Sequence, residues 1–319
     1  MSSINQFLLK NGLRIAQNPC VSPDFCLDWH ALLADIGAGK IKEYPKSRFA
    51  TTAGEFTLLE NAQGDCAWKL HADAQPLSSG ASLGDTTVFP ATWNNLLKLK
   101  NLIQEHNPAS TIFPGAGAKL GRSTLGVGAR FTTLHWPAVE WAMSALEIGL
   151  TANQNSIPRE LVYDVDAMLS NRLDTVPFPF IGTNVPEGHQ GQSVEGMSHG
   201  CVISKLKTGF HHREIAWSFN ADHQPIGGKF DSREDALVTG CLLASYITFD
   251  LSPELALNQP AKLSDVPADI VAKTRARVAA AGLKLYDAAF NALLCTVWTP
   301  LQKMKRRDDK YAAARKAAF

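Results

Sequence analysis

Residues 214–255 constrain the fold of this chain more than any other stretch. Apolar and polar residues alternate over 215–222 as in a strand, a helix with an apolar stripe is expected over 231–244, and a second strand over 246–251. A strand, a helix and a strand joined by short loops form a βαβ unit, which requires a parallel strand pair. The sequence therefore predicts an α/β protein.

Two ionisable residues, Asp222 and His223, lie where the first of these strands is expected to end, just before Pro225. A carboxylate at a strand end can act as a general base, and a histidine can bind a divalent metal or serve as an acid. Neighbouring residues on a strand point to opposite faces, so both side chains reach one site only if the strand ends there. The second strand also ends on a carboxylate, Asp250. An ordinary structural role for the Asp-His pair is the alternative.

A glycine-rich segment over 115–130 has two interpretations. Its glycines allow close backbone approach to an anion, and Lys119, Arg122 and Arg130 supply positive charge. The spacing matches neither a Walker A sequence nor the dinucleotide fingerprint, so a flexible loop with ordinary turn glycines is an equal alternative.

Two further polar segments precede the βαβ unit. Residues 188–200 are expected to form a polar surface loop, in which Gln192 and Ser193 are short groups suited to hydrogen-bonding sugar hydroxyls. The His-His-Arg run over 211–213 is expected on the surface, because adjacent residues rarely ligate one ion.

Composition narrows the class of protein. Hydrophobic residues make up 45% and charged residues 19%, which is typical of a globular protein, and the net charge of +1 argues against a nucleic-acid partner. The six cysteines form no CxxC pair, which predicts reduced, mostly buried thiols and a reducing compartment. Without an apolar run of membrane-span or signal-peptide length, we predict a cytoplasmic protein that does not associate with membranes.

The chain as a whole is expected to consist of a small irregular N-terminal cap over 1–90 and a β/α region over 91–319. Within the cap, a hairpin is expected over 54–71. The other expected elements are helices over 92–106, from Pro137 onward and over 157–171; short strands over 176–184 and 201–206; and helices after Pro253, ending in a basic, solvated tail.

Several of these segments, taken in order, resemble the tagaturonate epimerase family of bacterial hexuronate-degrading enzymes. The matching segments are FNADHQP at 219–225, REDALVTGCLLASYITFDLSPEL at 233–255, QSV at 192–194, GVGAR at 126–130 followed by PAV at 137–139, and YPKS at 44–47. The resemblance spans roughly residues 40–290, and it depends on the order and spacing of the motifs because none of them is specific alone.

The resemblance implies a TIM-barrel-like enzyme that interconverts D-tagaturonate and D-fructuronate at C4 and uses a divalent metal ion of unidentified kind. Asp222 then corresponds to the proton acceptor and His223 to one metal ligand. The expected substrate-binding residues are Arg130 and Lys229 for the sugar-acid carboxylate, Gln192 and Ser193 for its hydroxyls, and Asp250 at the second strand end.

This sequence departs from the family pattern in two ways. Ala129 stands where the family has an Asp, and no Glu or His follows Leu255 to replace the proton donor and remaining ligands of the family's second half. The expected fold is therefore a complete or incomplete barrel. The chain is expected to be a short member of the family with a rebuilt site, to need a second chain, or a further copy of itself in a homo-oligomer, to complete the barrel, or to be a truncated or inactive relative. The alternative functions are another sugar isomerase or aldolase on the same scaffold, and a non-catalytic sugar-acid-binding relative without the metal.

Overall fold

The structure is a computed structural model that describes residues 27–121, 124–128, 132–153 and 192–319. It shows a mixed α/β protein whose chain divides into two compact units. The first unit comprises the chain up to Asp222, residues 243–247 and the last two residues; the second comprises His223–Leu242 and Thr248–Ala317. The division does not fall at the expected boundary near residue 90. That domain boundary is not tested by it and stays a prediction.

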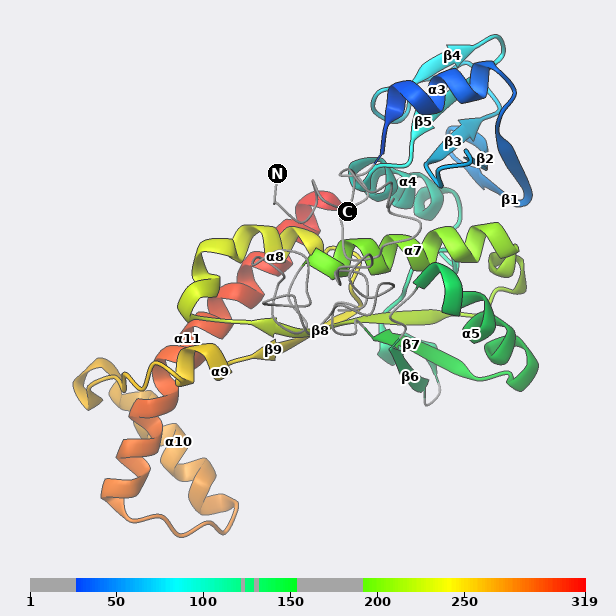
Figure 1. The fold of residues 1–319 in the computed structure, drawn as a ribbon. Coiled ribbons are helices and arrows are strands. Elements are labelled where there is room, and N and C mark those ends of the chain that lie inside the picture. The colour runs from blue at the N-terminus through cyan, green and yellow to red at the C-terminus, as the bar shows by residue number, and fades with distance from the viewer. Residues whose placement is uncertain (1–26, 122–123, 129–131, 154–191) are drawn as a thin grey trace, which may run out of the picture. The chain divides into compact units, whose positions relative to one another are not determined.

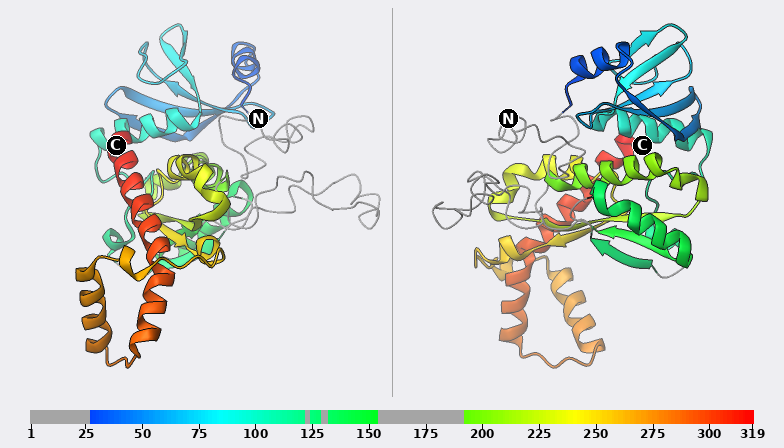
Figure 2. Two further views of the ribbon diagram at one scale, coloured as in Figure 1. Left: turned by 90° about the vertical axis from the view of Figure 1, so that its left-hand side faces the viewer. Right: turned by 45° about the vertical axis from the view of Figure 1, so that its right-hand side comes forward.

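The first unit begins with an antiparallel sheet in the order β1-β2-β3-β5-β4 (Figures 1 and 2). The hairpin expected over 54–71 is confirmed as β2 and β3, but the expectation of an irregular cap is wrong. Leu32 of α3 packs against Leu59, Ala67 and Val88 of the sheet, so an apolar core orders the region. The elements are α3 (Trp29–Gly37), β1 (Lys42–Thr51), β2 (Gly54–Glu60), β3 (Cys66–Leu70), β4 (Ala81–Leu83) and β5 (Thr86–Pro90).

Helix α4 (Trp93–His106) follows, as the apolar spacing predicted. The Thr92 hydroxyl caps it by accepting the Asn95 N–H at 3.3 Å. The buried Asn95 amide donates to the carbonyls of Ser78 and Pro90, each at 2.9 Å. These bonds fix the start of α4 against the end of β5.

The parallel sheet predicted from the βαβ unit has the order β6-β7-β8-β9 (Figure 1). Strands β6 and β7, and β7 and β8, pair in parallel. Ser245 N–H donates to the Phe219 carbonyl and Ile226 N–H to the Asp250 carbonyl, so residue numbers rise together along β8 and β9, as in a parallel pair. The strands are β6 (Thr124–Gly128), β7 (Gly149–Asn153), β8 (Trp217–Pro225) and β9 (Tyr246–Asp250).

The two helices that precede β7 and β8 cover one face of this sheet. The ring of Trp136 on α5 (Thr132–Leu146) lies 5.9 Å from that of Trp217 on β8. Lys205 Nζ on α7 (Gln192–Thr208) lies 5.1 Å from the same Trp217 ring. Crossovers between parallel strands are almost always right-handed, and consecutive crossovers in one direction place their helices on the same face of a sheet. The described strands form an open sheet, and a TIM barrel is not confirmed.

Several expected elements differ in the structure. Pro137 lies inside α5, which begins at Thr132. The expected loop over 188–200 and the expected strand over 201–206 lie in α7 from Gln192 onward. A short apolar run cannot be assigned to strand or helix by its periodicity, and burial on the sheet decides for helix here. The glycine-rich segment is not only a loop, because it contains β6 and the 3-10 turn η1 (Gly117–Leu120). The elements expected over 157–171 and 176–184 lie outside the described residues.

The second unit is helical after β9, as expected. The helix expected from Asp231 begins instead at Glu234, because residues 228–233 form a 3-10 turn. Phe290 and Leu294 of α11 pack against Val266, with Ile270 and Val271 of α10 beside them, and the helices form a hairpin (Figure 2). The elements are η5 (Gly228–Arg233), α8 (Glu234–Gly240), α9 (Ser252–Leu255), η6 (Leu263–Asp265), α10 (Ala268–Ala280) and α11 (Asp287–Ala318).

Candidate functional site

The face of the parallel sheet opposite α5 and α7 carries polar side chains. Trp217 of β8 points toward the helices, so its neighbour Ser218 points to the other face. There the Ser218 hydroxyl hydrogen-bonds the Thr151 hydroxyl of β7 at 2.7 Å, which in turn hydrogen-bonds the Thr124 hydroxyl of β6 at 2.8 Å. This hydroxyl row crosses three strands. Its hydrogen bonds were not predicted from the sequence.

Along β8 the same alternation continues from Ser218 to Asn220 and then Asp222, as the sequence predicted. Asn220 is buried and Asp222 is partly buried. Burial raises the pKa of Tyr246, at the start of β9, and the negative charge of Asp222 raises it further. The polar face therefore leads toward a carboxylate that is close enough to Tyr246 to affect its ionisation.

His223 interrupts the regular strand. The strand does not end at Asp222-His223, as expected, but continues to Pro225. His223 instead adopts a φ of 46°, which is uncommon for a residue other than glycine and turns the backbone locally. Its half-exposed ring places Nδ1 4.0 Å from Oδ2 of Asp250.

Asp250 is the last residue of β9, as predicted, and two hydrogen bonds fix it there. Its Oδ1 accepts the Ser252 N–H at 2.9 Å, and its carbonyl accepts the Ile226 N–H at 2.9 Å. The second unit therefore brings His223 and Asp250 close to each other near the ends of neighbouring strands. The sequence predicted both positions but not their contact.

A metal site needs more donors than this pair supplies. In the described part of the chain, no three His, Cys, Asp or Glu side chains are grouped so that they could hold a metal ion. His223 and Asp250 offer at most two of the three protein ligands that a catalytic zinc site usually has. The described residues alone do not fit the divalent ion that the family resemblance implies.

The remaining predicted binding residues are only partly described. Gln192 and Ser193 begin α7, and Lys229 lies in η5, but the orientation of these three side chains is outside the described structure. Arg130 lies outside the described residues altogether. Their predicted roles stay predictions.

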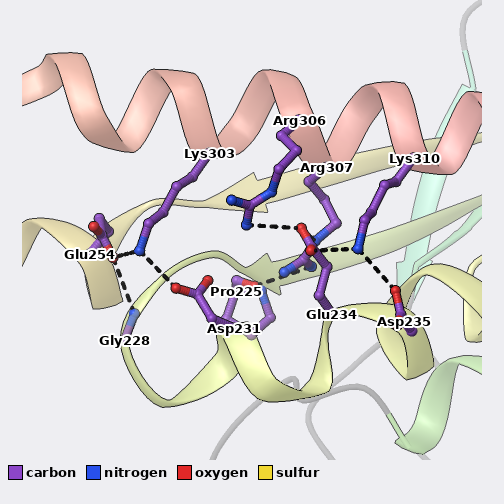
Figure 3. A network of polar contacts seen from close by, with 10 residues as sticks. All are labelled: Pro225, Gly228, Asp231, Glu234, Asp235, Glu254, Lys303, Arg306, Arg307 and Lys310. Carbon is purple, nitrogen blue, oxygen red and sulfur yellow. Dashed lines mark hydrogen bonds and ion pairs between the residues drawn. The ribbon is translucent and has the colours of Figure 1, made fainter.

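A charged network on α11 was not predicted from the sequence (Figure 3). Lys303 Nζ donates to Asp231 at 2.7 Å and to Glu254 at 2.8 Å. Further along the helix, Glu234 accepts hydrogen bonds from the basic side chains of Arg306, Arg307 and Lys310. The helical tail was correctly predicted, but these basic residues are not simply solvated.

The spacing of the basic residues could have revealed this network. Lys303, Arg307 and Lys310 recur at intervals of four and three residues, which places them on one face of a helix. Glu234 is buried, and although its burial raises its pKa, the hydrogen bonds from Lys310 and Arg307 and the nearby charges lower the pKa to about 2.

Histidines and cysteines elsewhere are mostly structural. His212 and Arg213 are exposed, as expected of the run over 211–213, but His211 is buried, and its Nε2 is 3.1 Å from the Arg48 carbonyl. His199 contacts the Ala91 carbonyl at 3.0 Å, and burial lowers its pKa to about 4. The described cysteines are free, as predicted, and burial raises the pKa of Cys66 to about 12.

Two cavities lie in the first unit. One of about 440 Å³ is lined by Gly149 at the start of β7 and by Ile215 just before β8. The other, of about 1090 Å³, is lined by residues that include Arg48, His106 and His211. The described residues that line them do not include Asp222, so these cavities do not identify the site proposed from the sequence.

No family model matches this sequence, and no curated protein matches it. Structures of the fructuronate-tagaturonate epimerase UxaE from Cohnella laeviribosi are distantly similar in fold. The native structure has 14% identity and a TM-score of 0.44, and the similarity covers 88% of this chain and 52% of that chain. The structure with one glycerol has 12% identity and a TM-score of 0.43, covering 90% and 53%. The chain therefore spans about half the length of these proteins, and likeness at this level carries no information on activity.

Membrane insertion can be assessed for the described helices. None of them combines the length and the apolar character needed to cross a membrane.

Proposed function

We propose that this chain is a sugar-acid epimerase that interconverts D-tagaturonate and D-fructuronate at C4. The observation that carries the proposal is the polar face of the parallel sheet, where Thr151, Ser218 and Asn220 lead toward Asp222. Parallel sheets are normally apolar on both faces, so polar residues there indicate a function. The order of the sequence motifs that resemble the tagaturonate epimerase family supports the choice of substrate.

In the proposed reaction Asp222 acts as the base. Its carboxylate takes the proton from the C4 hydroxyl, the C3–C4 bond breaks, and the electron pair passes to the C2 carbonyl oxygen as an enediolate forms. The C4 aldehyde then rotates and exposes its other face. The C3–C4 bond forms again, and the proton returns to the C4 oxygen with the configuration inverted.

His223 and Asp250 are proposed to bind substrate or metal oxygens beside this reaction. Histidine and carboxylate are both metal-ligand types, and the two are held together at neighbouring strand ends. The divalent ion stays a prediction, since further ligands would be needed from outside the described residues. No step above passes through the ion.

A second candidate function is a sugar-acid-binding protein without catalysis. The observation that favours it is the lack of a three-ligand group among the described residues. Metal analysis of the purified protein separates the two candidates, because a stoichiometric divalent ion favours the enzyme. A metal-free protein that still binds hexuronates favours the binder.

The direct test is conversion of D-tagaturonate, followed by NMR, in Asp222→Asn and in Asp235→Asn as a control. Asp235 is an exposed carboxylate on α8 whose loss leaves the polar face intact. Asp222→Asn should lower kcat by about 10²–10⁴-fold, the usual contribution of a general base. Full activity in Asp222→Asn would show that Asp222 is not the base.

Solvent deuterium tests the bond that breaks. In D₂O, cleavage between C3 and C4 leaves the C4 hydrogen on carbon, so the product should contain no deuterium at C4. Deuterium at C4 would instead indicate direct removal of that hydrogen and would refute the cleavage step.

A further inference from the structure

Beyond β8, the chain turns through two glycines that approach a carboxylate very closely. Gly227 and Gly228 have positive φ values of 89° and 54°. A Cβ at Gly227 would lie only 2.1 Å from Oε2 of Glu254, so a larger residue cannot coexist with that carboxylate position. Glycine is therefore needed here both for the backbone conformation and for the approach of the carboxylate.

The Glu254 carboxylate accepts hydrogen bonds from one backbone donor and one side-chain donor (Figure 3). Its Oε2 accepts the backbone N–H of Gly228 at 3.1 Å and the ammonium of Lys303 at 2.8 Å. The Glu254 side chain is only 9% exposed, whereas that of Lys303 is 21% exposed. A backbone N–H at a glycine turn combined with a lysine is a common arrangement for binding an anion.

The location of this turn suggests a role beyond structure. It directly follows β8, and Ile226 just before it hydrogen-bonds the carbonyl of Asp250 at the end of β9. In open α/β sheets, ligands bind outside the carboxyl ends of the strands. The Gly228 N–H therefore lies close to the strand ends outside which ligands bind in such sheets.

We propose that Gly228 N–H and Lys303 form a binding site for the carboxylate of a sugar acid, which Glu254 occupies as an internal substitute ligand. A ligand carboxylate would displace Glu254 and take over its two hydrogen bonds. The choice of a sugar acid rests on the proposed function; the contacts that define the site do not.

The contacts themselves explain why Glu254 must leave first. The Gly228 N–H and the Lys303 ammonium both donate to the same oxygen, Oε2 of Glu254. A ligand carboxylate can therefore take both hydrogen bonds only where the Glu254 carboxylate now lies. Asp231, the second partner of Lys303, would keep the ammonium in place during the exchange.

Titration of Glu254→Ala with D-galacturonate, monitored by isothermal calorimetry and the Gly228 amide NMR signal, tests the site. The variant should bind about tenfold more tightly than the wild-type protein, because an internal ligand competes at high effective concentration. D-Galactose, which lacks the carboxylate, should not bind. Adding Lys303→Met to Glu254→Ala should abolish binding and the shift of the Gly228 signal.

Circular dichroism establishes that each variant is folded. If Glu254→Ala is not folded, Glu254→Gln replaces it, since the neutral amide keeps the size of the side chain and should also bind more tightly than the wild-type protein. A folded variant that does not bind D-galacturonate, or binding that Lys303→Met leaves unchanged, overturns the proposal. D-Galacturonate is not the proposed substrate, so a lack of binding would overturn the carboxylate site without overturning the proposed epimerase. The conversion of D-tagaturonate tests the epimerase separately.

Discussion

Replacing either member of the buried Lys205–Glu140 pair should destabilise the first unit, whereas replacing both should destabilise it much less than the sum of the two single changes. Lys205 on α7 is 1% exposed, and Glu140 on α5 is 2% exposed. Lys205 Nζ lies 4.2 Å from the centre of the Phe210 ring, and Glu140 accepts a hydrogen bond from the Thr208 hydroxyl at 2.7 Å. Burial has the larger effect on both pKa values, but the charge of Lys205 lowers the pKa of Glu140 and the charge of Glu140 raises the pKa of Lys205, so each favours the charged form of the other.

The magnitude follows from leaving one buried charge alone. Leaving a buried charged or polar group without its partner typically costs about 1–3 kcal/mol, whereas neutral replacement of both partners is often neutral. Lys205→Met and Glu140→Gln should each lower the free energy of unfolding by about 1–3 kcal/mol. The double variant should lose about 1 kcal/mol, so the two effects should be strongly non-additive.

The pH dependence provides a second check on the pair. Burial raises the pKa of Glu140, so the folded protein keeps a proton there that the unfolded chain releases, and stability falls as pH rises above 4.5 through the raised pKa. Burial lowers the pKa of Lys205, so stability also falls as pH drops from 10.5 through the lowered pKa. The two buried charges should therefore destabilise the fold most at a pH between the raised pKa of Glu140 and the lowered pKa of Lys205.

Urea denaturation of the four proteins from pH 5 to pH 10 measures both effects. We expect the free energy of unfolding of the wild-type protein to pass through a minimum in this pH window. The double variant, which lacks both ionisable groups, should not show that minimum. If the single substitutions cost less than about 1 kcal/mol each, or if their effects simply add, the two charges do not depend on each other and the reasoning is wrong.

Three further variants test the second unit and the polar face. Glu234→Gln should remove about 2 kcal/mol of stability that is present above pH 4.5 and lost as pH falls toward 2, because its pKa is lowered in the folded protein; an unchanged acid-denaturation curve would contradict this. Gly227→Ala should lower Tm more than Gly282→Ala, since both have positive φ but only Gly227 has Glu254 in the way; equal Tm shifts would refute the contact. Thr151→Val should lower the free energy of unfolding, measured by chemical denaturation, by about 1–3 kcal/mol, because the Ser218 hydroxyl loses its partner. An unchanged free energy of unfolding would show that this hydrogen bond does not stabilise the fold.

Local pattern in the sequence was sufficient to predict the main elements of this fold. Alternation over 215–222 predicted β8, which begins at Trp217, and apolar spacing over 93–106 predicted α4, because side chains repeat every two residues in a strand and about every 3.6 in a helix. The positions of Asp222 and Asp250 near the ends of β8 and β9 were also predicted from the sequence. The sequence thus identified which residues belong to the strands and which face of β8 is polar.

Tertiary structure decided what those patterns could not specify. The run over 201–206 became helix because α7 buries it against the sheet, and an apolar run this short fits either structure. The contacts of His223 with Asp250, of Lys303 with Glu254, and of Thr151 with Ser218 join residues 27 to 67 positions apart. Such contacts depend on how separate elements pack, and no local periodicity encodes that packing.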